Sequence, residues 1–176
     1  MSLATAAAIR DRVRQLLGWV DPVSLIDTRL RDFRNEGAAE FRAWAEENVA
    51  ACFRRFQVRN VGHDETPIIS NTDYERRRLD LEVVVAYPQT NRAGSDNAMD
   101  RDDIIEEDWD QIDFNIGIAS RGNFGSTNDC TPLGCTKEIE RGDGVDFLVV
   151  RAEFTYNRAL AIGGLVGGLP AGIGGG

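Results

Sequence analysis

Few side chains in this sequence could form a catalytic pair of nucleophile and base. The sole histidine, His63, lies in a polar stretch, and no GxSxG motif occurs. A nucleophilic Ser, Cys or Thr needs such a neighbouring base. Neither GxGxxG nor GxxxxGK[ST] follows a strand pattern, so the glycine-rich loops that hold nucleotide phosphates are missing. The sequence therefore predicts a protein that is not an enzyme and has no cofactor.

Carboxylates are the one chemically active group in excess, and they gather near residue 100. Two of them could serve as an acid and a base, and several could bind a cation. A calcium-binding loop spaces its ligands around a central glycine, and that spacing is absent here. Acids in the first turns of a helix also complement the helix dipole. We expect a solvated helix face without a metal, with a carboxylate- or metal-dependent enzyme as the alternative. The acids are Asp100, Asp102, Asp103, Glu106 and Glu107.

Three cysteines, Cys52, Cys130 and Cys135, are too few and too widely spaced for a disulfide framework. We expect ordinary reduced thiols. Two alternatives stay open for Cys130 and Cys135, which are separated by the four residues TPLG. They could form a disulfide within a loop, or they could supply half of a metal site that needs two further ligands.

The charge of the chain argues against a protein that reads nucleic acid. Asp and Glu number 29 against 20 Lys and Arg, giving a net charge of −9, and Lys137 is the only lysine. A nucleic-acid binder gathers basic side chains to neutralise phosphates. No window approaches the roughly 20 apolar residues that cross a bilayer, and the N-terminal stretch lacks a signal-peptide pattern. We therefore expect an intracellular protein without a membrane partner.

Helical periodicity appears in three segments. Apolar residues recur at steps of three and four over residues 3–20, 38–52 and 100–117. The third segment carries Ile105, Trp109, Ile112 and Ile116 on one face. We predict an amphipathic helix for each.

Alternation of period two predicts the strands. The clearest strand covers residues 79–87 and ends at Pro88, which has no amide hydrogen to donate. The last strand has apolar residues on both faces at its start, which indicates a central place in a sheet. Residues 60–65 and 89–98 are predicted as turns or loops. The other predicted strands cover 53–59, 67–70, 131–140 and 145–156, with a turn at 141–144.

These elements predict an α+β fold, with a mixed or antiparallel sheet of about four to five strands packed by amphipathic helices. Residues 1–160 form a single domain, in which residues 53–160 are the core of sheet and helix. Residues 161–176 hold 8 of the chain's 18 glycines. Such a segment does not repay the entropy of ordering by itself. We expect it to be a flexible tail, or an arm that orders against a neighbour.

Three segments resemble the tail-terminator (tail-completion) proteins of tailed bacteriophages. They are RRRLDLEVVVAYP at 76–88, RDDIIEEDWDQI at 101–112 and DFLVVRAEFTYNRAL at 146–160. In that family a strand ending in a Tyr-Pro or Leu-Pro step precedes a helix that opens with several acids, and a charged and aromatic strand comes last. The resemblance covers residues 53–160 in pattern. The extra segment 38–52 and the glycine-rich end depart from the smaller members.

The resemblance implies a structural virion protein, assembled in the host cytoplasm. Such proteins form a ring, usually a hexamer, on the last ring of the tail tube. The ring stops tube polymerisation and joins the tail to the head connector. The implied partners are other copies of the chain, the tail-tube protein and the head-completion (stopper) connector protein, with DNA only passing through. Another neck or minor tail component with the same outline is the alternative.

Charged strand faces are the candidate subunit interface. On two strands charged residues alternate with apolar ones, so they project from one face. We predict that they form ion pairs between subunits. The alternative is that they face water or pair within the sheet. The residues are Arg76, Arg78, Asp80, Glu82, Arg151 and Glu153.

Overall fold

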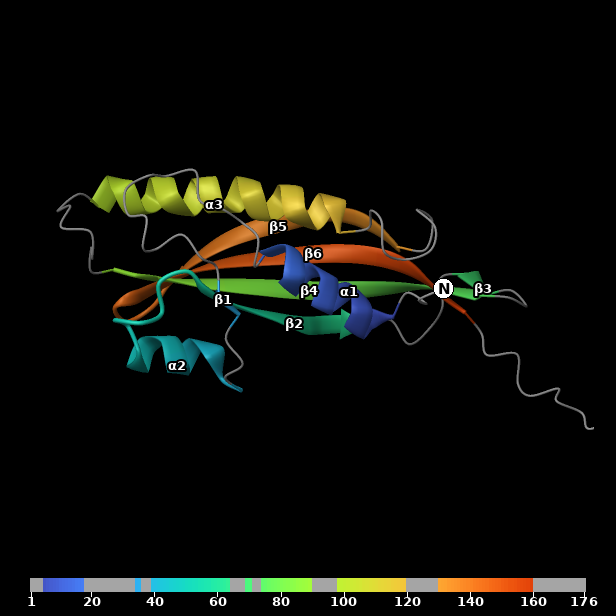
Figure 1. The fold of residues 1–176 in the computed structure, drawn as a ribbon, viewed down its shortest axis with the longest axis horizontal. Helices are drawn as coiled ribbons and strands as arrows, with labels where there is room; N and C mark the ends of the chain where they lie inside the picture. Colours follow the sequence, from blue (N-terminus) through green and yellow to red (C-terminus); the bar gives the residue numbers. More distant parts are fainter. Residues whose placement is uncertain are drawn as a thin grey trace, which may run out of the picture.

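The fold is an α+β arrangement built on one curled sheet (Figure 1). The computed structural model describes residues 5–17, 34–35, 39–63, 69–70, 74–89, 98–119 and 130–159. The helices are α1 (Ala6–Leu17), α2 (Phe41–Glu47) and α3 (Ala98–Ile118). The strands are β1 (Arg34–Asn35), β2 (Arg55–His63), β3 (Ile69–Ser70), β4 (Tyr74–Pro88), β5 (Cys130–Arg141) and β6 (Val145–Ala159).

The sheet has the strand order β1-β2-β4-β6-β5, and β3 pairs with β4 beside β2. The four long strands are antiparallel, whereas the two-residue β1 is parallel to β2. β6 has a partner on each side, which confirms the predicted central position of the last strand. The α+β class and the mixed, mainly antiparallel sheet are confirmed. The predicted domain limits, 1–160, stay a prediction, although all the described strands join this one sheet.

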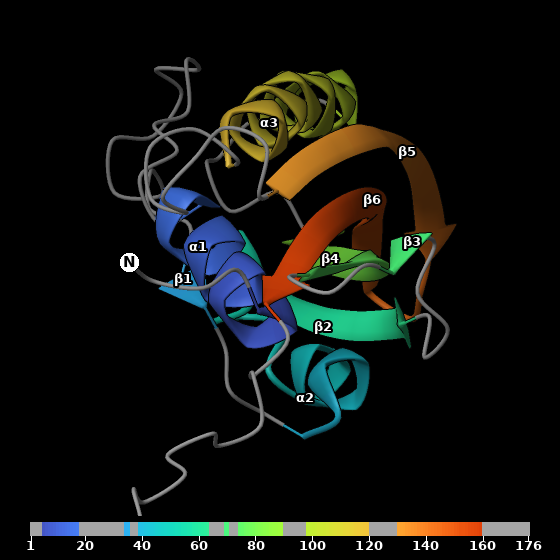
Figure 2. The same cartoon turned by 90° about the vertical axis from the view of Figure 1, so that its right-hand side faces the viewer.

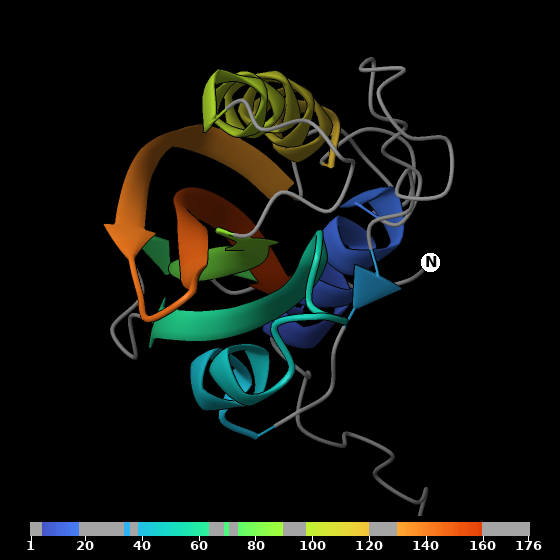
Figure 3. The same cartoon turned by 90° about the vertical axis from the view of Figure 1, so that its left-hand side faces the viewer.

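Alternation along β4 and β6 gives the sheet two different faces. On one face Leu79, Leu81 and Val83 of β4 join residues of β6 in a core that α1 and α3 cover. On the other face Val84 and Ala86 pack under α2 in a smaller cluster. Figures 2 and 3 look at the sheet from its two ends and show α1 and α3 on one side and α2 below β2. Burial of both faces explains why β4 is apolar at odd and even positions near its C-terminal end.

α3 carries the predicted apolar stripe and one charge that the pattern does not reveal. Ile105, Ile112 and Ile116 are buried against the sheet, as expected. Asp108 lies on the same face and is completely buried. It accepts hydrogen bonds from Arg54 Nε at 2.9 Å and Nη2 at 2.5 Å, and from the Tyr87 hydroxyl at 2.8 Å. This buried ion pair ties α3 to the start of β2 and the end of β4.

Two predicted boundaries are wrong. α2 ends at Glu47 rather than residue 52. Asn48 is its C-cap, with a non-helical φ of −115° and ψ of +38°, and its side-chain amide donates to the Trp44 carbonyl. β2 continues through residues 60–63, where a turn was predicted, and it has a bulge between Asn60 and Gly62. A Cβ on Gly62 would lie 2.7 Å from Asp80 Oδ2, so a larger residue here would require the Asp80 carboxylate to move.

Several other predictions hold with shifted ends. β4 begins at Tyr74 rather than residue 79, because pairing with β6 continues along its arginine-rich start. The β5–β6 turn at 141–144 is confirmed, with Gly144 in the left-handed region at φ +76°. The predicted loop at 89–98 falls largely outside the described residues, and the segment 161–176 does so entirely. Within the described parts, no helix is both long enough and apolar enough to cross a membrane.

The buried ion pair generates a stability prediction. Asp108→Ala leaves the Arg54 guanidinium buried without its carboxylate, a change that costs about 3–5 kcal/mol in comparable buried pairs. We expect the free energy of unfolding in urea to fall by about that amount. Asp110→Ala, on the exposed side of the same helix, is the control and should change it by less than about 0.5 kcal/mol. Equal losses in the two variants would contradict the role given to Asp108.

Candidate functional site, the open face of the sheet

α2 covers only the part of its sheet face near the β5–β6 turn, where the smaller apolar cluster lies. The rest of this face carries charged side chains and is called the open face below. All six sequence-predicted interface residues belong to it, four from β4 and two from β6. Their neighbours on the outer long strands are Arg59, Val61, Leu133, Thr136 and Glu138. The structure therefore brings the six predicted residues together on one surface.

Glu82 is the centre of the open face. It is only 4% exposed and stands opposite Arg59 on β2 and opposite Arg151 on β6. Its carboxylate lies 2.5 Å from Arg59 Nη2, 3.4 Å from Arg151 Nε and 4.0 Å from Arg42 Nη2 of α2. Three arginines thus surround one buried carboxylate, which satisfies the charge of Glu82 within the subunit.

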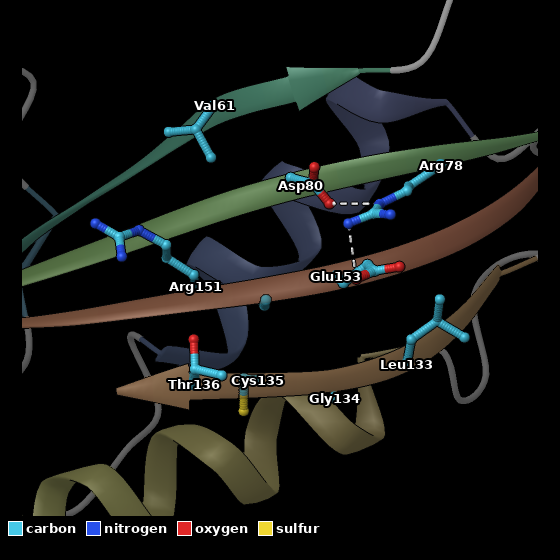
Figure 4. A pocket seen from close by; sticks show the side chains of 10 residues that line it. Val61, Arg78, Asp80, Leu133, Gly134, Cys135, Thr136, Arg151 and Glu153 are labelled. Atoms are coloured by element: carbon cyan, nitrogen blue, oxygen red, sulfur yellow. Dashed lines mark hydrogen bonds and ion pairs between the residues drawn. The ribbon is translucent and has the colours of Figure 1, made fainter. Parts of the chain in front are cut away.

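Asp80 and Glu153 form the next row of the open face and stand directly opposite each other. Two like charges in such cross-strand positions repel. Arg78 relieves this repulsion, since its Nε lies 3.1 Å from Asp80 and its Nη2 lies 2.9 Å from Glu153 (Figure 4). Arg76, one row further, donates to the Thr155 hydroxyl at 3.1 Å. Within one chain, these residues therefore pair with each other across the sheet, as the alternative interpretation of the sequence predicted.

The open face is electrically balanced. With the additional pair from Arg151 to Glu138 at 3.3 Å, the charged groups of the four long strands that take part in these contacts are four arginines and four carboxylates. They are Arg59, Arg76, Arg78 and Arg151, and Asp80, Glu82, Glu138 and Glu153. The contacts within one chain do not test whether any of these groups also meets another subunit, so that role stays a prediction.

A depression of about 460 Å³ lies across the Asp80–Glu153 row. The row runs through all four long strands as Gly62, Asp80, Glu153 and Gly134. A Cβ on Gly134 would meet nothing within 4 Å, so this glycine leaves room at the β5 end of the row. Gly134 adopts φ +141°, a conformation that favours glycine. Gly134 therefore contributes to the depression at its β5 end.

A β-bulge lies beside each of these glycines. The pairing shifts between Asn60 and Gly62 in β2 and between Pro132 and Gly134 in β5. The residues left out of the pairing are Val61 and Leu133, which are 47% and 54% exposed and line the depression. Figure 4 shows them on opposite sides of the charged row. Bulges commonly re-aim side chains at functional surfaces. The two-residue alternation of the sequence did not predict that these residues lie on the open face, because a bulge interrupts the alternation.

Cys130 and Cys135 lie on the side of β5 that α3 covers and not in the charged row. Cys130 is buried in the core, and Cys135 points toward α3 (Figure 4). Their partners on β6 are Tyr156 and Ala152. These two partners are four residues apart on β6, so the Cα atoms of Cys130 and Cys135 lie about 13 Å apart along the strand. This distance is beyond the ~7 Å limit for a disulfide. The alternative of a loop disulfide is therefore wrong.

The Cys135 thiol is held in its neutral form. Its Sγ donates a hydrogen bond to Asp113 Oδ1 at 2.6 Å. Partial burial, together with this carboxylate, raises the pKa of Cys135 to about 12. Since the thiolate is the nucleophilic form, Cys135 is unreactive near pH 7.

The acidic turns of α3 are partly neutralised by neighbouring strands. Glu106 forms an ion pair with Lys137 of β5, and Asp102 lies 3.6 Å from Arg141. Across the described residues, no group of three or more His, Cys, Asp or Glu side chains is placed to hold a metal ion.

The chain matches no protein-family model and no curated protein sequence. The open face combines paired charges with two exposed apolar side chains, Val61 and Leu133.

The contact between Cys135 and Asp113 generates a prediction about thiol reactivity. Asp113→Asn removes the negative charge that raises the Cys135 pKa, so more thiolate forms at a given pH. Each unit by which the pKa falls raises the thiolate fraction about tenfold. We expect iodoacetamide to alkylate Cys135 at least several-fold faster at pH 8.5, with peptide mass spectrometry as the readout. Asp110→Asn is the control, and an unchanged rate in Asp113→Asn would contradict the assignment.

Proposed function

We propose that this chain is a structural, non-enzymatic subunit of a tailed-bacteriophage virion. Its copies close into a ring, of the hexameric kind that the resemblance implies, at the head-proximal end of the tail. There the ring stops polymerisation of the tail tube and joins the tail to the head connector. The observation that carries the proposal is the open face, a part of the sheet that none of the described helices covers.

The chemistry of the open face supports contact with other copies. Its positive and negative groups are equal in number and interleaved, so the same surface can pair with another charged surface of the chain. Ion pairs of this kind fix orientation and suppress wrong partners more than they add affinity. The exposed Val61 and Leu133 supply apolar area, which contributes more of the affinity of an interface.

The order of the elements supports the proposed family. β4 ends at Pro88, α3 opens with a run of acids, and the β5–β6 hairpin closes with a long charged and aromatic strand. These are the three segments on which the resemblance rests, and they adjoin one another in the fold: β6 lies beside β4, and α3 packs over the sheet.

The acidic balance suits a ring through which DNA passes. Exposed carboxylates repel the phosphate backbone, so DNA slides without being held. On α3 four exposed acids recur at steps of three and four residues, which places them along one side of the helix. They are Asp103, Glu106, Asp110 and Asp113, of which Glu106 also pairs with Lys137 of β5 and Asp113 accepts the hydrogen bond of the Cys135 thiol. We assign this side of α3 to the channel.

The terminator role is tested by tails assembled without this protein. If the ring stops tube growth, tails formed in its absence have tubes of irregular and excessive length and do not join to heads. Electron microscopy of lysates measures both properties, with complementation by the wild-type gene as the control. Tubes of normal length would contradict termination and would favour another neck component.

The open face is tested by charge reversal. Arg78→Glu places a third carboxylate beside Asp80 and Glu153, so this surface repels an acidic partner group. We expect ring formation to need at least tenfold more protein, measured by analytical ultracentrifugation. Arg10→Glu, at a half-buried position of α1 outside the open face, is the matched control and should assemble as the wild type does. Circular dichroism of both variants separates assembly from folding. Unchanged assembly of Arg78→Glu would remove Arg78 from the interface.

A further inference from the structure

The depression on the open face has the form of a binding site for an uncharged, apolar segment. Its two rims are apolar, formed by Val61 on β2 and Leu133 on β5. Its floor contains Arg78, Asp80, Arg151 and Glu153, two positive and two negative groups that already contact one another or Glu82. A charged ligand would have to compete with these existing ion pairs for a partner of opposite charge. An uncharged occupant leaves these pairs intact and buries the two apolar rims.

The chain itself contains one segment of this chemistry. From Ala159 to Gly176 there is no ionisable side chain, and apolar residues alternate with glycines. The apolar members are spaced along the segment as Leu160, Ile162, Leu165, Val166, Leu169 and Ile173. Glycine has no Cβ, so the backbone can approach a flat surface closely. Its amides and carbonyls can then bond to the carboxylates and guanidinium groups of the floor.

The direction and length of the chain favour the depression of another copy. β6 passes through the floor at Glu153 and ends at Ala159, six residues or about 20 Å further on. The C-terminal end of β6 therefore points away from the depression of its own subunit. Residues 160–176 can extend over at most about 60 Å, which is enough to reach a copy beside it.

We propose that residues 160–176 of one subunit bind in the depression between Val61 and Leu133 of a neighbouring subunit. The inference rests on the proposed ring, since the ring supplies the neighbour. Apolar side chains of the arm contact the two rims, and its glycine-rich backbone lies over the Asp80–Glu153 row. The arm thereby links each subunit to the next.

Hydrogen exchange of the full-length chain tests the arm. In assembled wild-type rings, amides in residues 160–176 should exchange at least tenfold more slowly than in dissociated subunits. Leu133→Asp puts a charge on one rim and should abolish that protection. Phe114→Asp is the matched control, because Phe114 is 67% exposed on α3 and does not line the depression. Its rings should keep the protection.

A cross-linking experiment covers the case in which Leu133→Asp prevents ring formation. A photo-crosslinking amino acid replaces Val61, and isotopically heavy and light chains are mixed before assembly. We expect cross-links from position 61 to residues 160–176, joining heavy to light chains. Cross-links within one chain only, or to other segments, would overturn the inference.

The outcomes separate this inference from the proposed function. Rings that form while residues 160–176 exchange as fast as in free subunits would overturn the arm and leave the ring in place. Protection that persists in Leu133→Asp rings would also overturn it. A wild-type chain that never assembles, alone or with tail tubes, would overturn the proposed function itself.

Discussion

The pairing of β4 with β6 is the constraint on which the rest of the structure depends. All fifteen residues of β4 pair with the fifteen residues of β6. Because strand side chains alternate between faces, a slip of one residue would move every side chain of a strand to the opposite face. Arg78 would then point into the helix-covered core, and Leu79 would point to solvent. The register thus fixes both the core and the open face.

The buried group of Arg54, Asp108 and Tyr87 fixes the helix layer on that sheet. A buried ion pair contributes little net stability, because desolvation of both charges offsets their attraction. It does select one position for α3, because a shift of the helix would leave Asp108 or Arg54 buried without its partner. Burial, reinforced by the Asp108 carboxylate, raises the pKa of Tyr87 well above its usual value. The phenol therefore stays protonated as a donor to Asp108. Arg54 has φ +56°, an uncommon backbone conformation for a non-glycine residue, at the entry to β2.

The sequence predicts secondary structure correctly wherever apolar residues repeat with one period along a segment. β4, α3 and β6 were predicted because their apolar residues repeat every two residues or every three to four. For the same reason, the six charged residues could be assigned to one surface before their neighbours were known. Alternation therefore predicts which residues of the open face project together. It does not predict which groups these residues contact.

Features that depend on distant partners could not be predicted. Asp108 looks like one acid among many on α3, and only Arg54, 54 residues earlier, makes it a core residue. Val61 and Leu133 lie in stretches whose alternation is interrupted, so neither was expected at a surface site. The extension of β2 past residue 59 depends on β4, whose Asp80 lies beside Gly62. In each case the missing information is the cross-strand or helix-to-sheet neighbour.

The balance of charge on the open face determines what kind of contact it can make. If each arginine had lacked a carboxylate, a partner would be needed to neutralise the face, and the free subunit would carry a large electrostatic penalty. Here Glu82 has three arginines around it and the Asp80–Glu153 repulsion is relieved by Arg78. The free subunit is therefore already satisfied. A partner on this face gains its affinity mainly from the apolar rims, while the interleaved charges reject surfaces whose pattern does not match.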